Sequence, residues 1–129
     1  MITILPADEA FLKEMTAPAG TDAMVLREGG EVTGYALFRL TDGVSAGDTV
    51  EILRVEAQEP LLVDGLIRSV LNTGDCRGAK YGLCRVAALE PVLRRLEFRP
   101  AEDEQGANFR IVIEEFFNGP CPSEKGMSL

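Results

Sequence analysis

The sequence predicts an α/β (α+β) fold with a mixed, mostly antiparallel central sheet, one parallel crossover pair of strands, and helices on both faces of the sheet. The crossover is indicated by a strand pattern at 48–57, a helical pattern at 60–71 and an apolar strand pattern at 81–88. A strand, a helix and a strand in this order favour a right-handed connection between parallel strands. The antiparallel part is indicated by the paired glycines of 28–31, which accept the positive φ angles of a two-residue hairpin turn.

The residues before the crossover predict one helix and several strands that form a meander. Pro6 suits the first position of a helix, and Asp8 and Glu9 in the first turn suit the helix dipole. Gly34 lies inside a predicted strand and indicates a bulge or a close approach of another backbone segment. The expected elements are a strand at 2–5, a helix from Pro6 to about Met15, strands at 23–27 and 32–40, and a turn at 41–47.

The crossover strand carries two sets of apolar residues that would lie on opposite faces of a regular strand. Val50 and Ile52 form one set, and Leu53, Val55 and Ala57 form the other. A strand that is buried on both faces has this pattern. A bulge between Ile52 and Leu53 produces it as well. Both interpretations are consistent with the sequence.

The chain after the crossover strand continues as one domain to residue 122, followed by a flexible tail at 123–129. Asn72, Thr73 and Gly74 are expected to end the crossover helix, because a glycine after the last turn accepts the left-handed cap conformation. The later elements are expected to be the strand at 81–88, a short helix from Glu90, an acidic loop at 101–107, a strand at 109–115 and an anchor of Phe116 and Phe117.

Length and composition indicate a globular domain and exclude several kinds of chemistry. The 129 residues are 46% hydrophobic and 26% charged, and no apolar run is long enough to span a membrane. The first residues lack a signal-peptide pattern, so we expect a cytoplasmic protein with no membrane partner. The absence of histidine excludes Ser-His and Cys-His nucleophilic catalysis. Three cysteines without CxxC spacing predict free thiols, and no metal site is expected.

Charge is distributed unevenly along the chain. The net charge of −8 argues against non-specific binding to nucleic acid. Residues 1–64 hold 4 basic and 12 acidic side chains, whereas residues 65–100 hold 7 basic and 3 acidic ones. The segment 65–100 is therefore the positive part of the chain, and the acidic remainder favours a cationic partner through long-range steering.

Three short phrases stand at characteristic places in this order of elements. Residues 27–38 read R-E-G-G-E-V-T-G-Y-A-L-F, residues 50–56 read V-E-I-L-R-V-E, and residues 92–100 read V-L-R-R-L-E-F-R-P. The phrases and the element order together resemble the GNAT N-acetyltransferase family over nearly the whole chain. The resemblance implies the mixed sheet described above and the transfer of an acetyl group from acetyl-CoA to an amine, here a small molecule.

The resemblance also implies the position of the site. An acyl-CoA would lie in a wedge between the strands at 50–57 and 81–88, with its pantetheine paired to the backbone at Leu53 and Val55. Its pyrophosphate would lie at the start of the following helix, where Gly65 and Arg68 are the candidate binding residues. A carboxylate, Glu51 or Glu56, would accept the proton of the amine. A regular strand would direct these two carboxylates to opposite faces, so that at most one of them faces the wedge.

Two departures from the family pattern bear on function. The family's Arg/Gln-x-x-Gly-x-Gly/Ala loop corresponds to Pro60-Leu-Leu-Val-Asp-Gly65, in which only Gly65 fits. Leu93 stands where the family commonly has a tyrosine that protonates the leaving thiolate, and Glu97 replaces the glycine before Phe98. The sequence thus predicts weak CoA binding. It leaves open an N-acyltransferase or a catalytically inactive binding or regulatory module of the same fold, and a homodimer in either case.

Overall fold

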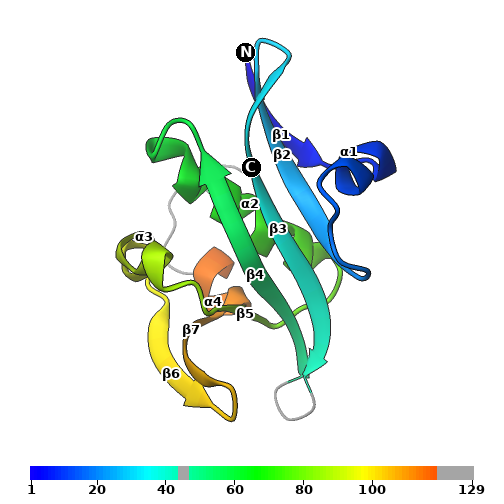
Figure 1. The fold of residues 1–129 in the computed structure, drawn as a ribbon. Helices are drawn as coiled ribbons and strands as arrows, with labels where there is room; N and C mark the ends of the chain where they lie inside the picture. The colour runs from blue at the N-terminus through cyan, green and yellow to red at the C-terminus, as the bar shows by residue number, and fades with distance from the viewer. Residues whose placement is uncertain (44–46, 119–129) are drawn as a thin grey trace.

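The computed structural model describes residues 1–43 and 47–118 and shows a seven-stranded sheet with the strand order β1-β2-β3-β4-β5-β7-β6 (Figure 1). All neighbouring strands are antiparallel except β4 and β5, which are parallel. This arrangement confirms the predicted mixed sheet with one crossover pair. The elements are β1 (Ile2–Pro6), α1 (Glu9–Glu14), β2 (Asp22–Glu28), β3 (Glu31–Gly43), β4 (Gly47–Ala57), α2 (Leu61–Cys76), β5 (Tyr81–Cys84), η1 (Ala87–Leu89), α3 (Glu90–Arg95), β6 (Arg99–Asp103), β7 (Gly106–Val112) and α4 (Ile113–Asn118).

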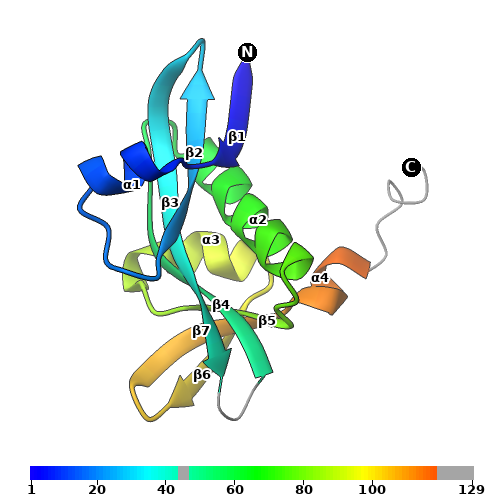
Figure 2. The same ribbon diagram turned by 90° about the vertical axis from the view of Figure 1, so that its right-hand side faces the viewer.

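Helices lie on both faces of the sheet but cover them unequally. In Figure 2, α2 and α4 lie on one side of the strands and the short α1 lies on the other. The face toward α2 holds the hydrophobic core, in which aliphatic side chains of α2 pack against β2, β3 and β4. Each such side chain contributes about 1.5–3 kcal/mol when it is fully buried. The core side chains that are completely excluded from solvent include Leu26, Val50, Ile52, Leu66, Ile67, Val70, Leu71 and Leu93.

The first helix begins later than the sequence predicts. Pro6 is the last residue of β1 and pairs with Met24, so it does not open the helix. Asp8 is the N-cap of α1, and its Oδ1 accepts a hydrogen bond from the Phe11 backbone N–H at 2.9 Å. An aspartate N-cap satisfies a free N–H of the first turn, which explains why the helix begins after Asp8.

The crossover helix continues past Gly74, where the sequence predicts its end. Gly74 is buried inside α2, and a Cβ atom added to it would lie 2.8 Å from Val50 Cγ1. The residue in the left-handed conformation is Gly78, with φ +93°. Gly74 therefore serves a close approach of helix and sheet, and Gly78 provides the backbone conformation that ends the helix.

The last third of the chain differs most from the prediction. The strand expected at 81–88 ends at Cys84, and the expected loop at 101–107 forms most of a hairpin between β6 and β7. The strand expected at 109–115 is β7, which ends at Val112, and α4 follows it. Pro100 made a strand at this position hard to predict, because proline cannot donate a hydrogen bond to a strand ladder. However, β6 lies at the edge of the sheet, where proline is tolerated.

Some expectations fall on residues outside the described ranges. These are the centre of the turn at 44–46, the tail at 123–129 and the side chain of Phe117. Phe116 is described and packs against the core, as predicted. None of the described helices is long and apolar enough to cross a membrane. Residues 1–43 and 47–118 also contain no group of three acidic or cysteine side chains that could hold a metal ion.

Candidate functional site

β4 contains a bulge at Leu53. Leu37 of β3 pairs with Arg54, whereas the next residue, Phe38, pairs with Ile52, so Leu53 has no partner in β3. This register shift decides between the two interpretations of the apolar pattern, in favour of the bulge. An extra residue in one strand reverses which face the following side chains occupy.

The bulge brings both candidate carboxylates to the same face of the sheet. Glu51 pairs with Arg39 and Glu56 pairs with Tyr35, and these two partners lie on one face of β3. Residues that are directly opposite in a ladder share a face. Glu51 and Glu56 therefore both lie on the face away from α2, which we call the open face. The separation that a regular strand would impose does not apply, because β4 contains this bulge.

β4 and β5 are paired over only part of their length. Their ladder runs from Thr49–Tyr81 to Ile52–Cys84, where β5 ends. β4 continues for five further residues, Leu53–Ala57, beyond the last pair (Figure 1). The chain after β5 turns into η1 and α3. The second half of β4 therefore has a strand neighbour, β3, on one side and no ladder with β5 on the other.

The backbone groups of Val55 are directed toward this unpaired side. The Gln58 N–H donates to Thr33 O at 2.9 Å, so the backbone of Gln58 faces β3. A Cβ atom on Gly34 would lie 2.7 Å from the backbone oxygen of Glu56, which faces β3 as well. Because backbone groups alternate in direction along a strand, those of Val55 face away from β3. They can form hydrogen bonds with an extended ligand that lies beside β4.

Both features predicted as alternatives at Gly34, a bulge and a close approach of another backbone segment, are present. The β2–β3 register shifts between Leu26 and Arg27, which leaves Thr33, next to Gly34, as an extra residue. Its Cα also approaches the β4 backbone too closely for any side chain. The glycine is thus required for the close contact between β3 and the second half of β4.

An ionic network crosses the open face beside the end of β5. Arg39 Nη2 lies 3.0 Å from Glu51 Oε1, and Arg85 Nε lies 3.6 Å from Glu51 Oε2. Arg85 also donates to both carboxylate oxygens of Asp103, at 2.9 and 2.6 Å. Arg110 Nη2 lies 3.9 Å from Asp103 Oδ2. Glu51 is only 9% exposed, so its charge is compensated mainly by these guanidinium groups.

Two groups near the end of β5 have shifted pKa values. Hydrogen bonds from the Arg85 side chain lower the pKa of Asp103 to about 2. Burial raises the pKa of the Cys84 thiol to about 11, which keeps the thiol protonated near neutral pH. Cys84 is therefore an inert core residue, in agreement with the sequence-based interpretation of free, structural thiols.

The start of α2 is a poor match for a pyrophosphate site. Its N-cap, Pro60, forms no side-chain capping bond. The N–H of Leu62 donates to Glu59 O at 2.9 Å and that of Val63 to Pro60 O at 3.2 Å, so both groups already have partners. Asp64 adds a negative charge in the first turn. A phosphate would have to compete with these carbonyl oxygens and with this carboxylate.

The two residues assigned to this position from the sequence lie on other contacts. Arg68 forms an ion pair with Asp64 at 2.5 Å and lies over the Phe116 ring, 5.3 Å from its centroid. A Cβ atom on Gly65 would lie 3.5 Å from Ile4 Cδ1 of β1, so the open side of this glycine faces the sheet. The assignments of Gly65 and Arg68 to cofactor binding remain predictions, as do those of Leu53, Val55, Glu51 and Glu56.

The departures near α3 have visible consequences. Leu93 is fully buried in the core, and its aliphatic side chain has no proton to donate. Glu97 has φ +74°, the left-handed conformation that glycine accepts most easily. The backbone shape that a glycine would provide is therefore kept, at a cost of about 1–2 kcal/mol.

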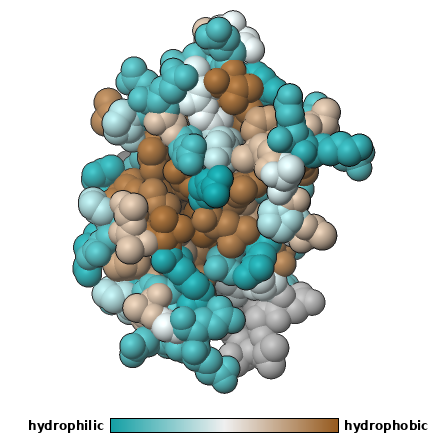
Figure 3. Space-filling view, viewed as in Figure 1, coloured by the Kyte–Doolittle hydropathy of each residue, from teal (hydrophilic) through white to brown (hydrophobic). Residues whose placement is uncertain are grey.

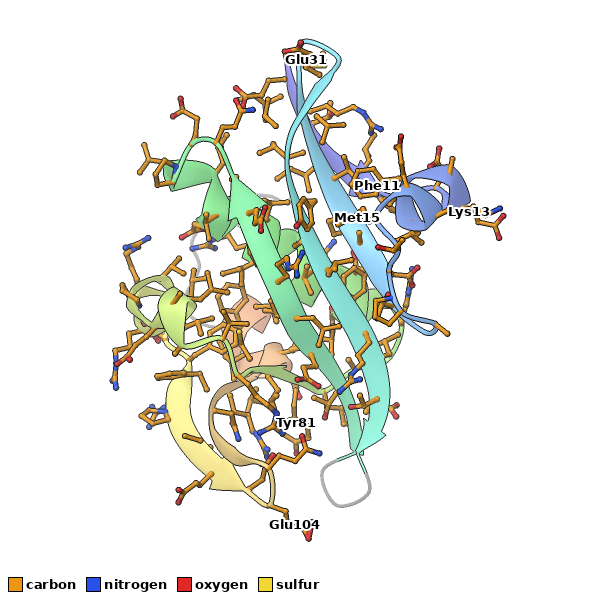
Figure 4. All side chains as sticks on the ribbon, viewed as in Figure 1. Phe11, Lys13, Met15, Glu31, Tyr81 and Glu104 are labelled. Carbon is orange, nitrogen blue, oxygen red and sulfur yellow. The ribbon has the colours of Figure 1, made fainter. Side chains whose placement is uncertain are left out.

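The surface of the open face has an apolar centre and a polar rim. Figure 3 shows apolar residues gathered in the middle of this face and hydrophilic residues around them. Phe11 and Met15, from α1 and its C-terminal end, lie over the β2–β3 side, whereas Tyr81 lies toward β7 (Figure 4). The Phe11 ring packs edge-on against Tyr35, with the centroids 6.3 Å apart. The helix α1 therefore covers only the β2–β3 side of this face.

Sequence patterns did not indicate this network. Arg85 was assigned to a continuous strand and Asp103 to a loop. Arg110 alternates with Phe109 and Ile111, which placed it on the polar face of its strand without indicating a partner. Gly106 was the sequence signal for the β6–β7 hairpin, because glycine accepts the positive φ of a turn. In the structure its φ is +113°, and the Gln105 N–H donates to Asp103 Oδ1 in the same turn.

Comparisons with known proteins find similar structures but no protein with a matching sequence among the families and curated proteins searched. No protein-family model and no curated protein matches the sequence. The structure is similar to that of a proposed acetyltransferase from Exiguobacterium, with a TM-score of 0.70 and 12% identity over 94% of this chain and 99% of the other. It is similar to a proposed acyl-CoA N-acyltransferase from Klebsiella pneumoniae, with a TM-score of 0.67 and 14% identity over 88% and 98%.

A third similar structure is an aminoglycoside N-acetyltransferase in complex with CoA. Its TM-score is 0.65, with 12% identity over 80% of this chain and 91% of the other. The chain therefore has the GNAT acyl-CoA N-acyltransferase fold, as its sequence resemblance predicted. At these identities the likeness establishes the fold alone, because one fold supports many functions.

Proposed function

We propose that this protein binds an acyl-CoA beside the second half of β4 and transfers the acyl group to a small amine. One observation carries the proposal: the ladder between β4 and β5 ends at Ile52 and Cys84, while the Val55 backbone groups face the unpaired side. A pantetheine arm contains amide groups that can pair with such a strand edge. Acetyl-CoA is the donor that we expect.

The chemistry requires a nucleophilic amine and a group that accepts its proton. The amine nitrogen attacks the thioester carbonyl carbon, a C–N bond forms and the C–S bond breaks. Glu51, at the level where β5 ends, accepts the proton lost by nitrogen, and Glu56 on the same face is the second candidate. Since Leu93 offers no acid, the leaving thiolate takes its proton from water.

A second function is favoured by the start of α2. The bonded N–H groups of Leu62 and Val63, together with Asp64, disfavour the phosphates of CoA. A protein that keeps the fold without binding CoA would act as a binding or regulatory module, through self-association or a protein partner. Even if CoA binds, we expect an affinity weaker than submicromolar, and calorimetric titration measures this directly.

A thermal-shift experiment separates the two functions. A ligand at 100 times its dissociation constant stabilises the folded state by about 2.7 kcal/mol. Acetyl-CoA should raise the melting temperature, and free CoA should do the same. An assay of thiol release with a panel of amines should then show turnover. If millimolar acetyl-CoA leaves the melting temperature unchanged, the acyltransferase proposal is wrong and the module is supported.

The Val55→Pro variant tests the position of the donor. Proline removes the backbone N–H that faces away from β3, whereas the ladder bonds to β3 remain available. The variant should stay folded and lose most of the shift with acetyl-CoA. Val55→Ala is the matched control, because it shortens the side chain but keeps the N–H. If Val55→Pro folds and binds CoA normally, the donor does not pair with this strand edge.

Three further expectations stay predictions. The chain is expected to be cytoplasmic and to bind no nucleic acid, and a homodimer is the oligomeric state to be tested. Sedimentation at several protein concentrations tests the dimer. The thermal-shift screen should include a DNA duplex, for which we expect no shift.

A further inference from the structure

A surface cavity of about 260 Å³ lies at the base of the β6–β7 hairpin, where the chain passes from α3 into β6. It has room for a small ligand, since one water molecule occupies about 30 Å³. Two arginines line it. Arg99 is exposed, and the side chain of Arg110 is 34% exposed, so both are accessible to a ligand from solvent.

The two arginines lie directly opposite each other in the hairpin. Arg99 pairs with Arg110 in the antiparallel ladder of β6 and β7. Side chains in this arrangement have their Cβ atoms about 4.5–5.5 Å apart, and like charges there destabilise the sheet. A neutral residue at position 99 would remove the repulsion, so the fold alone does not require this arginine. An anion bound between the two guanidinium groups removes the repulsion as well.

The protein supplies little compensating charge to this pair. Among the described residues Arg99 forms no ion pair, and Arg110 reaches only Asp103, at 3.9 Å. Asp103 already accepts two shorter hydrogen bonds from Arg85. Glu97 lines the cavity, but no ion pair within residues 1–43 and 47–118 joins it to either arginine. Two guanidinium groups thus face one carboxylate, which leaves the cavity positive.

The cavity is separate from the position proposed for the donor. Arg110 pairs with Leu83, and Leu83 pairs with Glu51, so these residues form one row across the open face. Arg110 and Glu51 are two strand spacings apart, about 10 Å. The second half of β4 runs away from this row toward the start of α2, at the other end of the sheet from the hairpin (Figure 1).

We propose that this cavity binds an oxyanion, the phosphate or carboxylate group of a small ligand, between the guanidinium groups of Arg99 and Arg110. Guanidinium groups match both anions, because their N–H donors form parallel pairs of hydrogen bonds with two oxygens. Val112, which lines the cavity and is 37% exposed, offers an apolar contact to the rest of the ligand. The site goes beyond the proposed acyltransferase function, because the anion binds without CoA.

An NMR titration tests the site and separates the two sources of the anion. Inorganic phosphate or acetate is added to the full chain at constant ionic strength, and the backbone amide shifts are followed. Amides of β6 and β7 around the cavity should shift and saturate. Tighter binding of phosphate would identify a phosphate ligand, and tighter binding of acetate a carboxylate ligand. Shifts that are absent, or that spread over the surface without saturation, would overturn the proposal.

Arg99→Gln separates anion binding from a structural role. The variant should bind the anion about tenfold more weakly or worse, the loss expected for a charge-assisted hydrogen bond. Without the anion its melting temperature should be unchanged or higher, because a repulsion is removed. Arg95→Gln, which removes another exposed charge between α3 and the hairpin, is the matched control and should bind normally. If Arg99→Gln binds as tightly as the native protein, the cavity is not an oxyanion site.

Glu97→Gln tests the same cavity in the opposite direction. Removal of this carboxylate makes the cavity more positive, so the anion should bind more tightly. The gain should shrink as NaCl is added, because exposed charges are screened by salt. Unchanged or weaker binding would show that the anion is not held beside Glu97 and would contradict the proposed position.

Acetyl-CoA distinguishes this site from the proposed function. Arg99→Gln should keep the thermal shift of the native protein with acetyl-CoA while it loses anion binding. Saturable anion binding in a protein that shows no shift with acetyl-CoA would support the oxyanion site and contradict the acyltransferase. If Arg99→Gln loses the shift with acetyl-CoA too, the cavity holds a phosphate of CoA, and a site independent of the donor is ruled out.

Discussion

The two faces of the sheet are built from different kinds of side chain. The face toward α2 is aliphatic and almost completely buried, and Val50 and Ile52 of β4 belong to the same core cluster as Leu66 and Ile67 of α2. The open face alternates with it along the same strands but holds charged residues around an apolar centre, and Glu51 stands between the two buried residues of β4. One strand thus supplies stability on one side and the candidate chemistry on the other.

This difference shows where a change of sequence is tolerated. A core accepts other apolar residues of similar volume at a cost below about 1.5 kcal/mol. A buried carboxylate is stable only with its partners, and removal of one partner leaves an uncompensated charge. Substitutions on the two faces should therefore have separable effects, on stability for one face and on turnover for the other.

The largest effect is expected from Glu51→Gln on turnover. Loss of a general base lowers kcat by about 10²–10⁴-fold. The amide is nearly isosteric, so the variant should still fold. The measurement is steady-state thiol release from acetyl-CoA with the best amine. Glu56→Gln, on the same face but further along β4, is the comparison and should reduce kcat less.

Two outcomes would contradict this assignment. Unchanged turnover in both variants would show that neither carboxylate accepts the proton. A loss of turnover in Glu56→Gln alone would identify Glu56, in the second half of β4, as the residue that accepts the proton. A melting curve for each variant shows whether reduced turnover reflects the loss of folded protein.

The next effect concerns stability and the core face. Ile52→Ala removes a fully buried side chain, 0% exposed, and should lower the free energy of unfolding by about 2–5 kcal/mol. Arg54→Ala, two residues later on the open face, removes an exposed side chain whose guanidinium donates to the Tyr35 hydroxyl at 3.3 Å. It should cost about 0.5 kcal/mol or less. Urea unfolding of both variants gives the comparison. Similar losses would mean that the open face is packed like the core.

Sequence patterns predicted the core face far better than the open face. Periodic apolar residues located β4 and α2, although not the end of α2, because burial against one layer imposes a regular spacing. The bulge at Leu53 was one of two open interpretations, since a one-residue shift leaves the composition of a strand unchanged. The network around Arg85 was missed because it joins residues from β3 to β7, and the spacing of charged residues does not indicate which strands are neighbours.

The smallest effect concerns the pH dependence of stability on the open face. Because hydrogen bonds from Arg85 hold the pKa of Asp103 at about 2, the folded state binds a proton there less readily than the unfolded chain, in which an aspartate has a pKa of about 3.9. The stabilisation by this pair is present above pH 4. It is lost as the pH falls toward 2.

Asp103→Asn removes this contribution at every pH. The difference in urea midpoint between the native protein and Asp103→Asn should be small and constant above pH 4, because the pair is exposed and partly screened by solvent. It should shrink between pH 4 and pH 2. A difference that persists unchanged at pH 2 would show that Asp103 stabilises the fold by packing and not through its charge, and the network would then be no more sensitive to acid than the core face.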